Sequence, residues 1–319
     1  MGLASMCSMH LFVYTTLNDN ARRLLLTQLP PHITATIRQD LSEDEQAAAF
    51  QLADILLGNP PVEWFAPASP PALRFWQIDS AGIERYQQVQ TQAQVANIGD
   101  FFAWPCAETM VAGILGWYRH IPELAVLQSN TEWVGAPIRE RLGLLRGKRV
   151  VILGSGAIGQ AVAKQLTGFD CVVQFLARTD PKAQLHTKEE LLAALPDTDI
   201  VVNCLPGSAE NFFSADLVQA MSPGSLYASV GRGNTTDEPA LLTALQAGRL
   251  GGAILDVTNQ EPLPLDNPLW QLPNVLLTQH SGGGQPGEDE GKVDVLVRNL
   301  RRFEQAQPLE NRVELSRGY

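Results

Sequence analysis

Residues 149–166 read RVVILGSGAIGQAVAKQL, and this stretch decides the fold. Its first part, Arg149–Leu153, is almost wholly apolar, as expected for a strand that is buried on both faces of a parallel sheet. A glycine-rich turn follows, and then Ile158, Val162 and Leu166 recur at the spacing of one helix face. The stretch therefore predicts a strand, a tight turn and a helix in direct succession.

The same alternation of short apolar runs and helical segments continues through the middle of the chain. Further strands are expected at Val172–Leu176, Asp199–Cys204, Ser225–Val230, Gly252–Val257 and Asn274–Thr278. The helices between them are expected at 154–169, 188–195, 214–221 and 237–247. Because strands separated by helices of this length form right-handed βαβ units, we expect a doubly wound parallel sheet and an α/β fold class.

The first hundred residues show a second, smaller alternation. It consists of an expected strand at His10–Tyr14, a helix at Asn18–Leu29, a helix-like apolar run at Ala47–Leu57 and a strand at Leu73–Ile78. A single long helix is expected from Pro105 to about Leu127, and another at Val293–Glu304. The chain is thus long enough for two domains, each with its own core.

The glycine-rich turn has the pattern G-x-G-x-x-G, made by Gly154, Ser155, Gly156, Ala157, Ile158 and Gly159. Glycines at this spacing permit a tight turn, a close approach of a pyrophosphate to the backbone, and close packing of helix on strand. The helix N-terminus adds unpaired N–H donors and a dipole that favours anions. Because the pattern follows a strand and begins a helix, it predicts a dinucleotide site.

The residues after the second strand of this unit indicate which dinucleotide fits. An enzyme that uses NAD usually has Asp or Glu there, and the carboxylate bonds the ribose hydroxyls. Here Ala177 takes that position, Arg178 and Thr179 follow it, and Asp180 comes too late and precedes Pro181. A guanidinium and a hydroxyl suit a 2′-phosphate, so we expect Arg178 and Thr179 to bind cofactor and NADP(H) to be favoured over NAD(H).

Composition and charge exclude several classes of protein. The 319 residues have a net charge of −11, which argues against nucleic acid as the main partner. With 45% hydrophobic and 18% charged residues, the chain is globular rather than disordered. The four cysteines, Cys7, Cys106, Cys171 and Cys204, lack metal-site spacing, so we expect no metal and no disulfide framework. No apolar run is long enough to span a bilayer, and we expect a cytoplasmic protein that binds no membrane.

Three chemically active side chains follow three different strands of the expected sheet. Arg232 follows Ser225–Val230, Glu261 lies in the loop after Gly252–Val257, and His280 follows Asn274–Thr278. The carboxyl ends of parallel strands meet at one edge of a sheet, which is where such folds bind ligands. The three residues are therefore expected to converge beside the dinucleotide site.

Four segments of the sequence are similar to those of the D-isomer-specific 2-hydroxyacid dehydrogenases. They are LRFWQIDSAGIE at 73–84, GSGAIG at 154–159, SVGRGN at 229–234 and GGAILDVTNQEPLPLDNPLWQLPNVLLTQH at 251–280. The resemblance covers essentially the whole chain. Within the family, the Arg-Thr pair after the second strand most resembles the NADPH-dependent glyoxylate and hydroxypyruvate reductases.

The resemblance implies a role for each member of the trio. Arg232 is expected to hold the substrate carboxylate or keto oxygen through its planar fork. His280 is expected to be the general acid that protonates the developing alkoxide, and the base in the reverse direction, with Glu261 bonded to its imidazole. Further binding residues implied for the cofactor are Asp256 at its nicotinamide end, with Leu205, Pro206, Val230 and Gly231. Ala81 and Gly82 are implied to present backbone N–H groups to the substrate, beside Arg232 and His280.

The resemblance also implies the arrangement of the domains. Residues 1–99 with 287–319 are expected to form a flavodoxin-like substrate domain, and residues 100–286 a Rossmann domain, with the active site in the cleft between them. A homodimer is implied, in which Trp133 lies on the dimer arm. The loop at 205–211 is about two residues shorter than is usual in the family, and Gly282–Gly284 make the stretch after His280 unusually rich in glycine.

Three functions remain open. The first is reduction of a short 2-ketoacid, such as glyoxylate or hydroxypyruvate, by hydride transfer from NADPH. The second is an NAD-dependent D-2-hydroxyacid dehydrogenase with a larger substrate. The third belongs to a different class, a non-catalytic scaffold that senses dinucleotides. A panel of ketoacids tested with both NADPH and NADH separates them.

Overall fold

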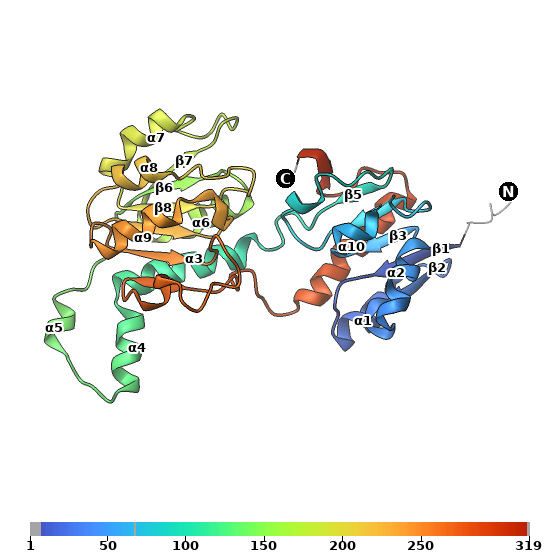
Figure 1. Ribbon diagram of the computed structural model, residues 1–319, viewed down its shortest axis with the longest axis horizontal. Helices are drawn as coiled ribbons and strands as arrows, with labels where there is room; N and C mark the ends of the chain where they lie inside the picture. Colours follow the sequence, from blue (N-terminus) through green and yellow to red (C-terminus); the bar gives the residue numbers. More distant parts are fainter. Residues whose placement is uncertain (1–7, 67, 318–319) are drawn as a thin grey trace. The chain divides into compact units, whose positions relative to one another are not determined.

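The computed structural model describes residues 8–66 and 68–317, and the chain divides into two compact units (Figure 1). One unit contains Met1–Phe101 and Gln285–Tyr319, and the other contains Phe102–Gly284. Each unit has its own six-stranded sheet with helices packed on it. The predicted fold class, α/β with two parallel-sheet domains, is therefore confirmed.

The sheet of the second unit is parallel throughout. Its strands are β6 (Arg149–Leu153), β7 (Val172–Leu176), β8 (Ile200–Asn203), β9 (Leu226–Ser229), β10 (Gly252–Leu255) and β11 (Val275–Leu277). Their order is β11-β10-β9-β8-β6-β7. Strand β6 pairs with β7 and β8, so that Leu153 is level with Leu176 on one side and Asn203 on the other. All six strands therefore end at the same edge, where the glycine-rich turn begins.

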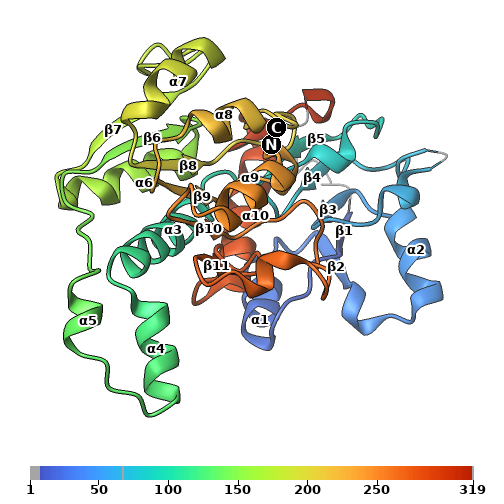
Figure 2. The ribbon, with the colours of Figure 1, turned by 60° about the vertical axis from the view of Figure 1, so that its left-hand side comes forward.

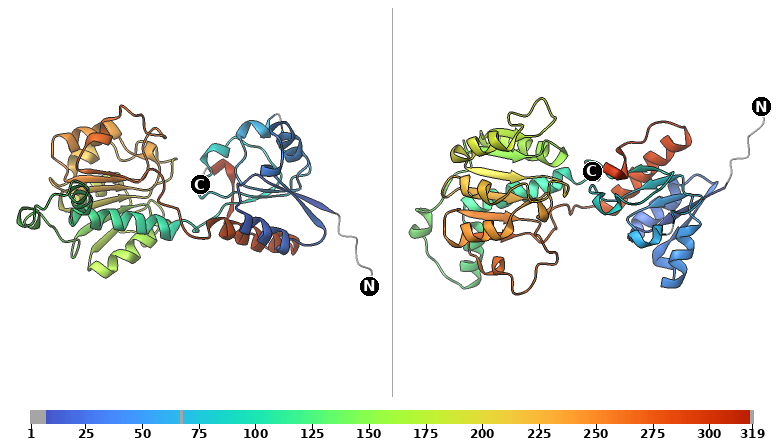
Figure 3. Two further views of the ribbon diagram at one scale, coloured as in Figure 1. Left: turned by 90° about the horizontal axis from the view of Figure 1, so that it is seen from below. Right: turned by 45° about the horizontal axis from the view of Figure 1, so that its top comes forward.

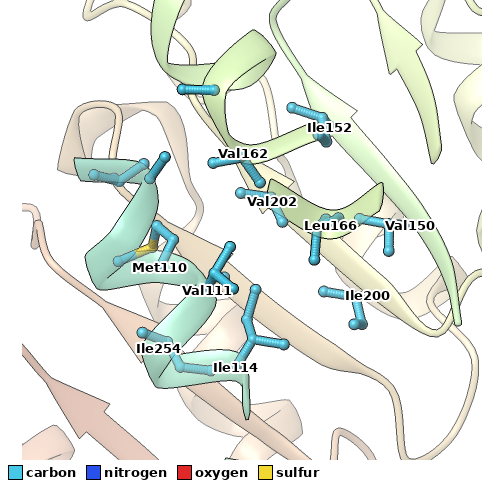
Figure 4. Packing of buried hydrophobic residues seen from close by; sticks show 14 of the residues in the cluster. Met110, Val111, Ile114, Val150, Ile152, Val162, Leu166, Ile200, Val202 and Ile254 are labelled. Atoms are coloured by element: carbon cyan, nitrogen blue, oxygen red, sulfur yellow. The ribbon is translucent and has the colours of Figure 1, made fainter. Parts of the chain in front are cut away.

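Helices cover both faces of this sheet. They are α3 (Ala103–Tyr118), α6 (Ala157–Leu166), α7 (Lys188–Ala194), α8 (Ala215–Ala220) and α9 (Glu238–Gln246). Alternate residues of β6 point to opposite faces: Val150 and Ile152 pack against α3 and α6, whereas Val151 and Leu153 pack against α7, α8 and α9. Figure 3, left, shows helices on both sides of this sheet. Figure 4 shows the first of these cores, in which Met110 and Ile114 of α3 approach the sheet. Burial on both faces explains why the strand sequences are continuously apolar.

The first unit repeats the same plan with shorter strands. They are β1 (Met9–Val13), β2 (Ile33–Ile37), β3 (Ile55–Leu57), β4 (Phe75–Gln77), β5 (Gln94–Ala96) and β12 (Arg312–Val313), in the order β12-β5-β4-β3-β1-β2. Only β12 is antiparallel among the described strands of this sheet. Helices α1 (Asp19–Gln28) and α10 (Glu288–Glu304) pack together on one face, and α2 (Glu43–Gln51) covers the other (Figure 3). The C-terminal helix thus completes the core of the N-terminal segment.

Two predicted helices are wrong in extent. The helix expected from Pro105 to Leu127 is two helices, α3 and α4 (Ile121–Ser129). The break occurs because His120 between them has left-handed backbone with a φ of 53°, and Pro122 lies in the first turn of the next helix. The run at 47–57 is the end of α2 followed by β3, not a single helix. Strands β2 and β5 were not predicted.

Helices α4 and α5 (Ala136–Arg139), with the segment between them, form an arm that extends away from the second sheet (Figures 1 and 2). Trp133 lies on this arm, and its side chain is 97% exposed. None of the helices in the described part of the chain is both long enough and apolar enough to cross a membrane.

Candidate active site

The glycine-rich turn follows β6 directly, and the fold itself requires two of its glycines. Gly154 has a φ of 95°, a backbone conformation that residues other than glycine rarely adopt. Its N–H donates to the carbonyl of Leu176 at 2.9 Å. A Cβ at Gly159 would strike the carbonyl oxygen of Gly154. These two glycines therefore allow the chain to turn sharply and α6 to pack closely on the strand.

Gly156 has a different reason for being glycine. It is the N-cap of α6, its backbone is extended, and no protein atom lies within 4 Å of the place where its Cβ would be. No side chain caps α6. The N–H groups of the first turn of α6 thus meet an open space, which is the environment that a pyrophosphate needs. Packing within the protein does not require glycine at position 156, whereas the close approach of a dinucleotide to the backbone would.

The loop after β7 contains the residues expected to select the dinucleotide. Arg178 and Thr179 are exposed, and within residues 8–66 and 68–317 the Arg178 guanidinium has no hydrogen bond or ion pair. Asp180 Oδ1 accepts a hydrogen bond from Lys182 N at 2.9 Å. This N–H and the hydroxyl of Ser155 lower the pKa of the Asp180 carboxyl. Sequence reasoning discounted Asp180 as too late in the loop, and its hydrogen bond to Lys182 N lies within that loop.

The loop after β8 is held by a buried polar network that sequence reasoning missed. Asn203 is fully buried at the end of the strand, and its Oδ1 accepts from Leu205 N at 3.0 Å. Its Nδ2 donates to the hydroxyls of Tyr227 and Thr235, each at 2.8 Å, and to Thr236 Oγ1 at 3.3 Å. The only sequence signal was a polar residue at the end of an apolar run.

The turn that carries Arg232 is attached to this network. Thr235 Oγ1 donates to the carbonyl of Arg232 at 2.6 Å, and the N–H groups of Val230 and Gly231 donate to the carbonyl of Asn203 at 3.0 and 3.2 Å. A Cβ at Gly231 would strike the carbonyl oxygen of Leu205. The loop containing Leu205 and Pro206 and the turn containing Arg232 are therefore packed backbone against backbone at one edge of the sheet.

His280 and Glu261 form a pair at the same edge. Glu261 Oε2 lies 2.6 Å from His280 Nδ1, and Glu261 Oε1 accepts from Thr258 N at 3.0 Å. An ionised carboxylate only accepts hydrogen bonds, so Nδ1 carries the hydrogen and Nε2 remains for a ligand. The imidazole is about half exposed, with 53% of its side chain accessible. The contact expected between these two residues is present.

Asp256 braces the turn that carries His280. It is 4% exposed, and its carbonyl accepts from His280 N at 2.6 Å. Its Oδ1 accepts from Thr278 Oγ1 at 2.6 Å and from the N–H groups of Ser281 and Gly282 at 3.1 Å each. These bonds hold His280 in left-handed backbone, with a φ of 53°. The contact of Asp256 with the nicotinamide stays a prediction.

Ala81 and Gly82 lie in the first unit, in the segment after β4. Asn97 Nδ2 donates to the carbonyl of Ala81, and Ser80 Oγ donates to the carbonyl of Gly82, both at 2.7 Å. Within the described part of the chain, neither N–H of the pair donates to another residue. Their carbonyls are fixed while their N–H groups keep the capacity to bind an anion.

Besides the His280–Glu261 pair, the described residues include two cysteines whose thiols burial keeps neutral. No group of three or more His, Cys, Asp or Glu among them is placed to hold a metal ion. Removal from water raises the pKa of the Cys106 thiol to about 11 and that of Cys204 to about 12, so both are neutral near pH 7. Cys7 lies outside the described residues. A cavity of about 570 Å³ adjoins the His280–Glu261 pair, and its apolar wall includes Leu263, Leu265 and Trp270.

The chain is similar to known proteins in sequence and in structure. Residues 111–282 match the family domain described as "D-isomer specific 2-hydroxyacid dehydrogenase, NAD binding domain". The chain is 31% identical over 219 residues to glyoxylate/hydroxypyruvate reductase A of Salmonella heidelberg (strain SL476), which covers 66% of this chain and 68% of that protein.

Among solved structures, the chain resembles a D-isomer specific 2-hydroxyacid dehydrogenase family protein from Aeromonas salmonicida subsp. salmonicida A449. The TM-score is 0.84 at 28% identity, covering 97% of this chain and 99% of the other. It also resembles a D-isomer specific 2-hydroxyacid dehydrogenase from Xanthobacter autotrophicus Py2, solved with NADPH and MES. Here the TM-score is 0.80 at 25% identity, covering 98% of this chain and all of the other.

Proposed function

Because the chain belongs to the D-isomer specific 2-hydroxyacid dehydrogenase family, we propose that it reduces a short 2-ketoacid to the D-2-hydroxyacid with NADPH. Glyoxylate and hydroxypyruvate are the proposed substrates. The observation that carries the proposal is the His280–Glu261 pair, 2.6 Å apart, at the same sheet edge as the glycine-rich turn. The relative from Salmonella, named for these two substrates, supports the choice.

The reduction needs a hydride and a proton. When bound, the dinucleotide supplies the hydride to the carbonyl carbon. His280 donates a proton from Nε2 to the carbonyl oxygen as that oxygen gains negative charge, and accepts it again in the reverse reaction. Glu261 fixes the tautomer by holding the hydrogen on Nδ1 and stabilises the imidazolium through its negative charge.

The substrate carboxylate is proposed to bind to Arg232. A guanidinium offers two parallel N–H donors that match the two oxygens of a carboxylate. Arg232 is half-buried in a turn whose backbone is fixed by Asn203 and Thr235, so it can hold an anion in a defined place. The N–H groups of Ala81 and Gly82 are proposed as further donors to the substrate.

NADPH is proposed over NADH because of the loop after β7. Ala177 replaces the usual acid, and the exposed Arg178 is not engaged by any described residue. A 2′-phosphate carries up to two negative charges and attracts such a guanidinium. The NADPH bound in the structure from Xanthobacter is consistent with this choice.

A homodimer formed through the arm is also proposed. Trp133 is 97% exposed, and Ile121, Val126 and Leu144 are more than half exposed on or next to the arm. A cavity of about 670 Å³ on the arm is lined mostly by apolar side chains, among them Leu127 and Trp133. Exposed apolar surface of this kind favours burial against another protein surface.

A second candidate substrate is a 2-ketoacid with a larger apolar side chain. The cavity beside His280 favours it, because Leu263, Leu265 and Trp270 give it a wall without charge. NADH would then be the alternative cofactor. A panel that includes glyoxylate, hydroxypyruvate and longer apolar 2-ketoacids, each with NADPH and NADH, decides between the two candidates.

The test of the mechanism is His280→Ala, which we expect to lower kcat by about 10²- to 10⁴-fold, the range for loss of a general acid. His32→Ala is the matched control, since His32 Nε2 pairs with Glu304 Oε1 at 2.7 Å in the first unit and should leave kcat unchanged. Full activity of the His280 variant would refute the acid role. If the wild-type protein binds NADPH but reduces no ketoacid of the panel, the non-catalytic scaffold replaces the enzyme.

A further inference from the structure

We propose that Glu238, in the first turn of α9, is a positioning residue that holds the loop of Glu261 in place and thereby aligns Glu261 with His280. This loop, residues 258–267, lies between β10 and the 3₁₀ turn Pro268–Gln271, and we call it the Glu261 loop. The proposal rests on the proposed function, because it concerns the residue that donates the proton in that reaction.

The two carboxyl oxygens of Glu238 contact opposite ends of the Glu261 loop. Oε2 accepts a hydrogen bond from Asn259 N at 2.9 Å, and Oε1 accepts one from Asn267 Nδ2 at 3.4 Å. Asn267 is itself fixed as the N-cap of the 3₁₀ turn, since its Oδ1 accepts from Leu269 N at 2.9 Å. One side chain therefore joins the start and the end of the loop to the N-terminus of α9.

The Glu261 loop has few other attachments to the rest of the protein. More than half of its residues are exposed. Within the described part of the chain, Glu238 and His280 are the residues outside 258–271 to which the loop is hydrogen-bonded. A bond such as that from Thr258 N to Glu261 Oε1, at 3.0 Å, lies within the loop and does not fix it relative to the sheet. The position of Glu261 therefore depends on Glu238.

The packing of the turn before α9 determines where Glu238 lies. The turn is in direct contact with the loop, because a Cβ at Gly233 would strike the carbonyl oxygen of Thr258. The side chain of Asp237 caps α9 by accepting from Ala240 N at 3.0 Å, which fixes the first helical turn. Glu238 belongs to this turn and is half-buried. The fold thus presents its carboxyl group to the loop.

Holding the loop affects proton transfer more than substrate binding. Glu261 keeps the hydrogen of the imidazole on His280 Nδ1 only while it stays within hydrogen-bond reach of that atom, and this leaves Nε2 to transfer the proton. The turn of Arg232 is held separately, since its backbone bonds the carbonyl of Asn203. Loss of the Glu238 carboxyl should therefore lower kcat and leave KM for the ketoacid nearly unchanged.

The first experiment measures steady-state kinetics with NADPH and the reduced ketoacid. For Glu238→Ala we expect a fall in kcat of about 10-fold, because a small misplacement of a reacting group slows the reaction. Glu238→Gln keeps an acceptor for one of the two bonds and should lose about 3-fold; it carries the test if the alanine variant does not fold. Glu189→Ala is the matched control, because Glu189 lies in the first turn of α7, and its kcat should equal that of the wild type.

A double-mutant cycle shows whether Glu238 acts through Glu261. In a protein that already has Glu261→Ala, the further change Glu238→Ala should lower kcat by less than about 2-fold, because the loop no longer carries the carboxylate that pairs with His280. Equal losses in the two backgrounds would overturn the proposal. So would an unchanged kcat in both Glu238 variants, or the same loss in Glu189→Ala.

A second readout needs no turnover. ¹⁵N spectra of the neutral imidazole of His280, assigned by the signal that His280→Ala lacks, should show the hydrogen on Nδ1 in the wild type and a mixture of both tautomers in Glu238→Ala. An unchanged tautomer in Glu238→Ala overturns the proposal. If the wild-type protein reduces no ketoacid, the proposed function fails, and the spectra still report on what Glu238 does.

Discussion

Each unit begins its sheet with a strand followed by a helix, and we call the helix N-terminus at this turn the corner of the unit. The residues that surround the two corners differ. In the first unit, β1 leads to α1, and the side chain of Asn18 caps the helix by accepting from Ala21 N at 2.9 Å. The carboxylate of Asp289 accepts from Asn18 N at 3.0 Å. In the second unit, β6 leads to α6, whose N-cap Gly156 has no side chain and no protein neighbour within 4 Å of its Cβ position.

The difference shows that strand order alone does not make a dinucleotide site. Both sheets place a helix N-terminus beside the second strand from one edge, and both helix ends offer unpaired N–H donors. The first unit satisfies one of these donors, Ala21 N, with the side chain of Asn18, and places the carboxylate of Asp289 on Asn18 N. The second leaves them for a ligand, so function lies in the residues of the turn and not in the topology.

The largest expected effect comes from giving α6 a side-chain cap at the corner of the second unit, as α1 has in the first unit. Gly156→Asp places a carboxylate where the pyrophosphate is proposed to bind, and we expect the affinity for NADP⁺ to fall at least about 100-fold through charge repulsion. The backbone there has φ −70° and ψ −174°, which any residue adopts, and Asp is a good N-cap. The free energy of unfolding should therefore change by no more than about 0.5 kcal/mol.

Calorimetry with NADP⁺ and thermal unfolding of the same protein check both parts of this prediction. If Gly156→Asp binds NADP⁺ as the wild type does, the pyrophosphate does not lie at α6. If the variant unfolds much more easily, the open space at Gly156 is needed by the protein itself and the comparison of the two corners fails.

The strands of the second unit could be predicted because burial on both faces makes them continuously apolar, with turns between them. For the same reason the positions of Arg232, Glu261 and His280 at one sheet edge could be inferred, since each follows such a strand. In the first unit, β5 has only three residues and offers too short a pattern. The helix break at His120 was missed because the apolar spacing continues across it, although Pro122 was a signal for a new start.

Asn203 could not be found from local pattern because its role depends on residues distant in sequence. Asn203 bonds Tyr227 and Thr236, which follow it by 24 and 33 residues. Periodicity reports which face of an element is buried, but not which polar group completes the hydrogen bonds of another loop.

An intermediate effect is expected from the buried amides of the two units. Asn203 in the second unit and Asn299 in the first are both fully buried, and Asn299 bonds Gln77 Oε1 at 2.8 Å and Glu310 N at 2.7 Å. Replacing either by Leu leaves buried groups without partners, so each should cost about 1–3 kcal/mol in the free energy of unfolding. Only Asn203→Leu should also lower kcat/KM, by about 10-fold, because it releases the Arg232 turn.

Urea unfolding and steady-state kinetics at saturating NADPH separate the two variants. The decrease in kcat/KM of Asn203→Leu should come from a higher KM for the ketoacid, since Arg232 is proposed to hold the carboxylate of the ketoacid. Equal kinetics in Asn203→Leu and Asn299→Leu would mean that the Asn203 network stabilises the fold without positioning Arg232.

The smallest effect is expected from removing the side-chain cap of α1 at the corner of the first unit. Asn18→Ala removes the cap of α1 and should lower the free energy of unfolding by about 1 kcal/mol, the usual contribution of an Asn N-cap. Kd for NADP⁺ should be unchanged, because this corner still has Asp289 beside it and no glycine turn to admit a phosphate. Urea unfolding measures the first quantity and calorimetry the second. A gain or loss of dinucleotide affinity in Asn18→Ala would show that the corner of the first unit also takes part in binding. The difference between a capped helix N-terminus and an uncapped one would then no longer explain which unit binds the cofactor.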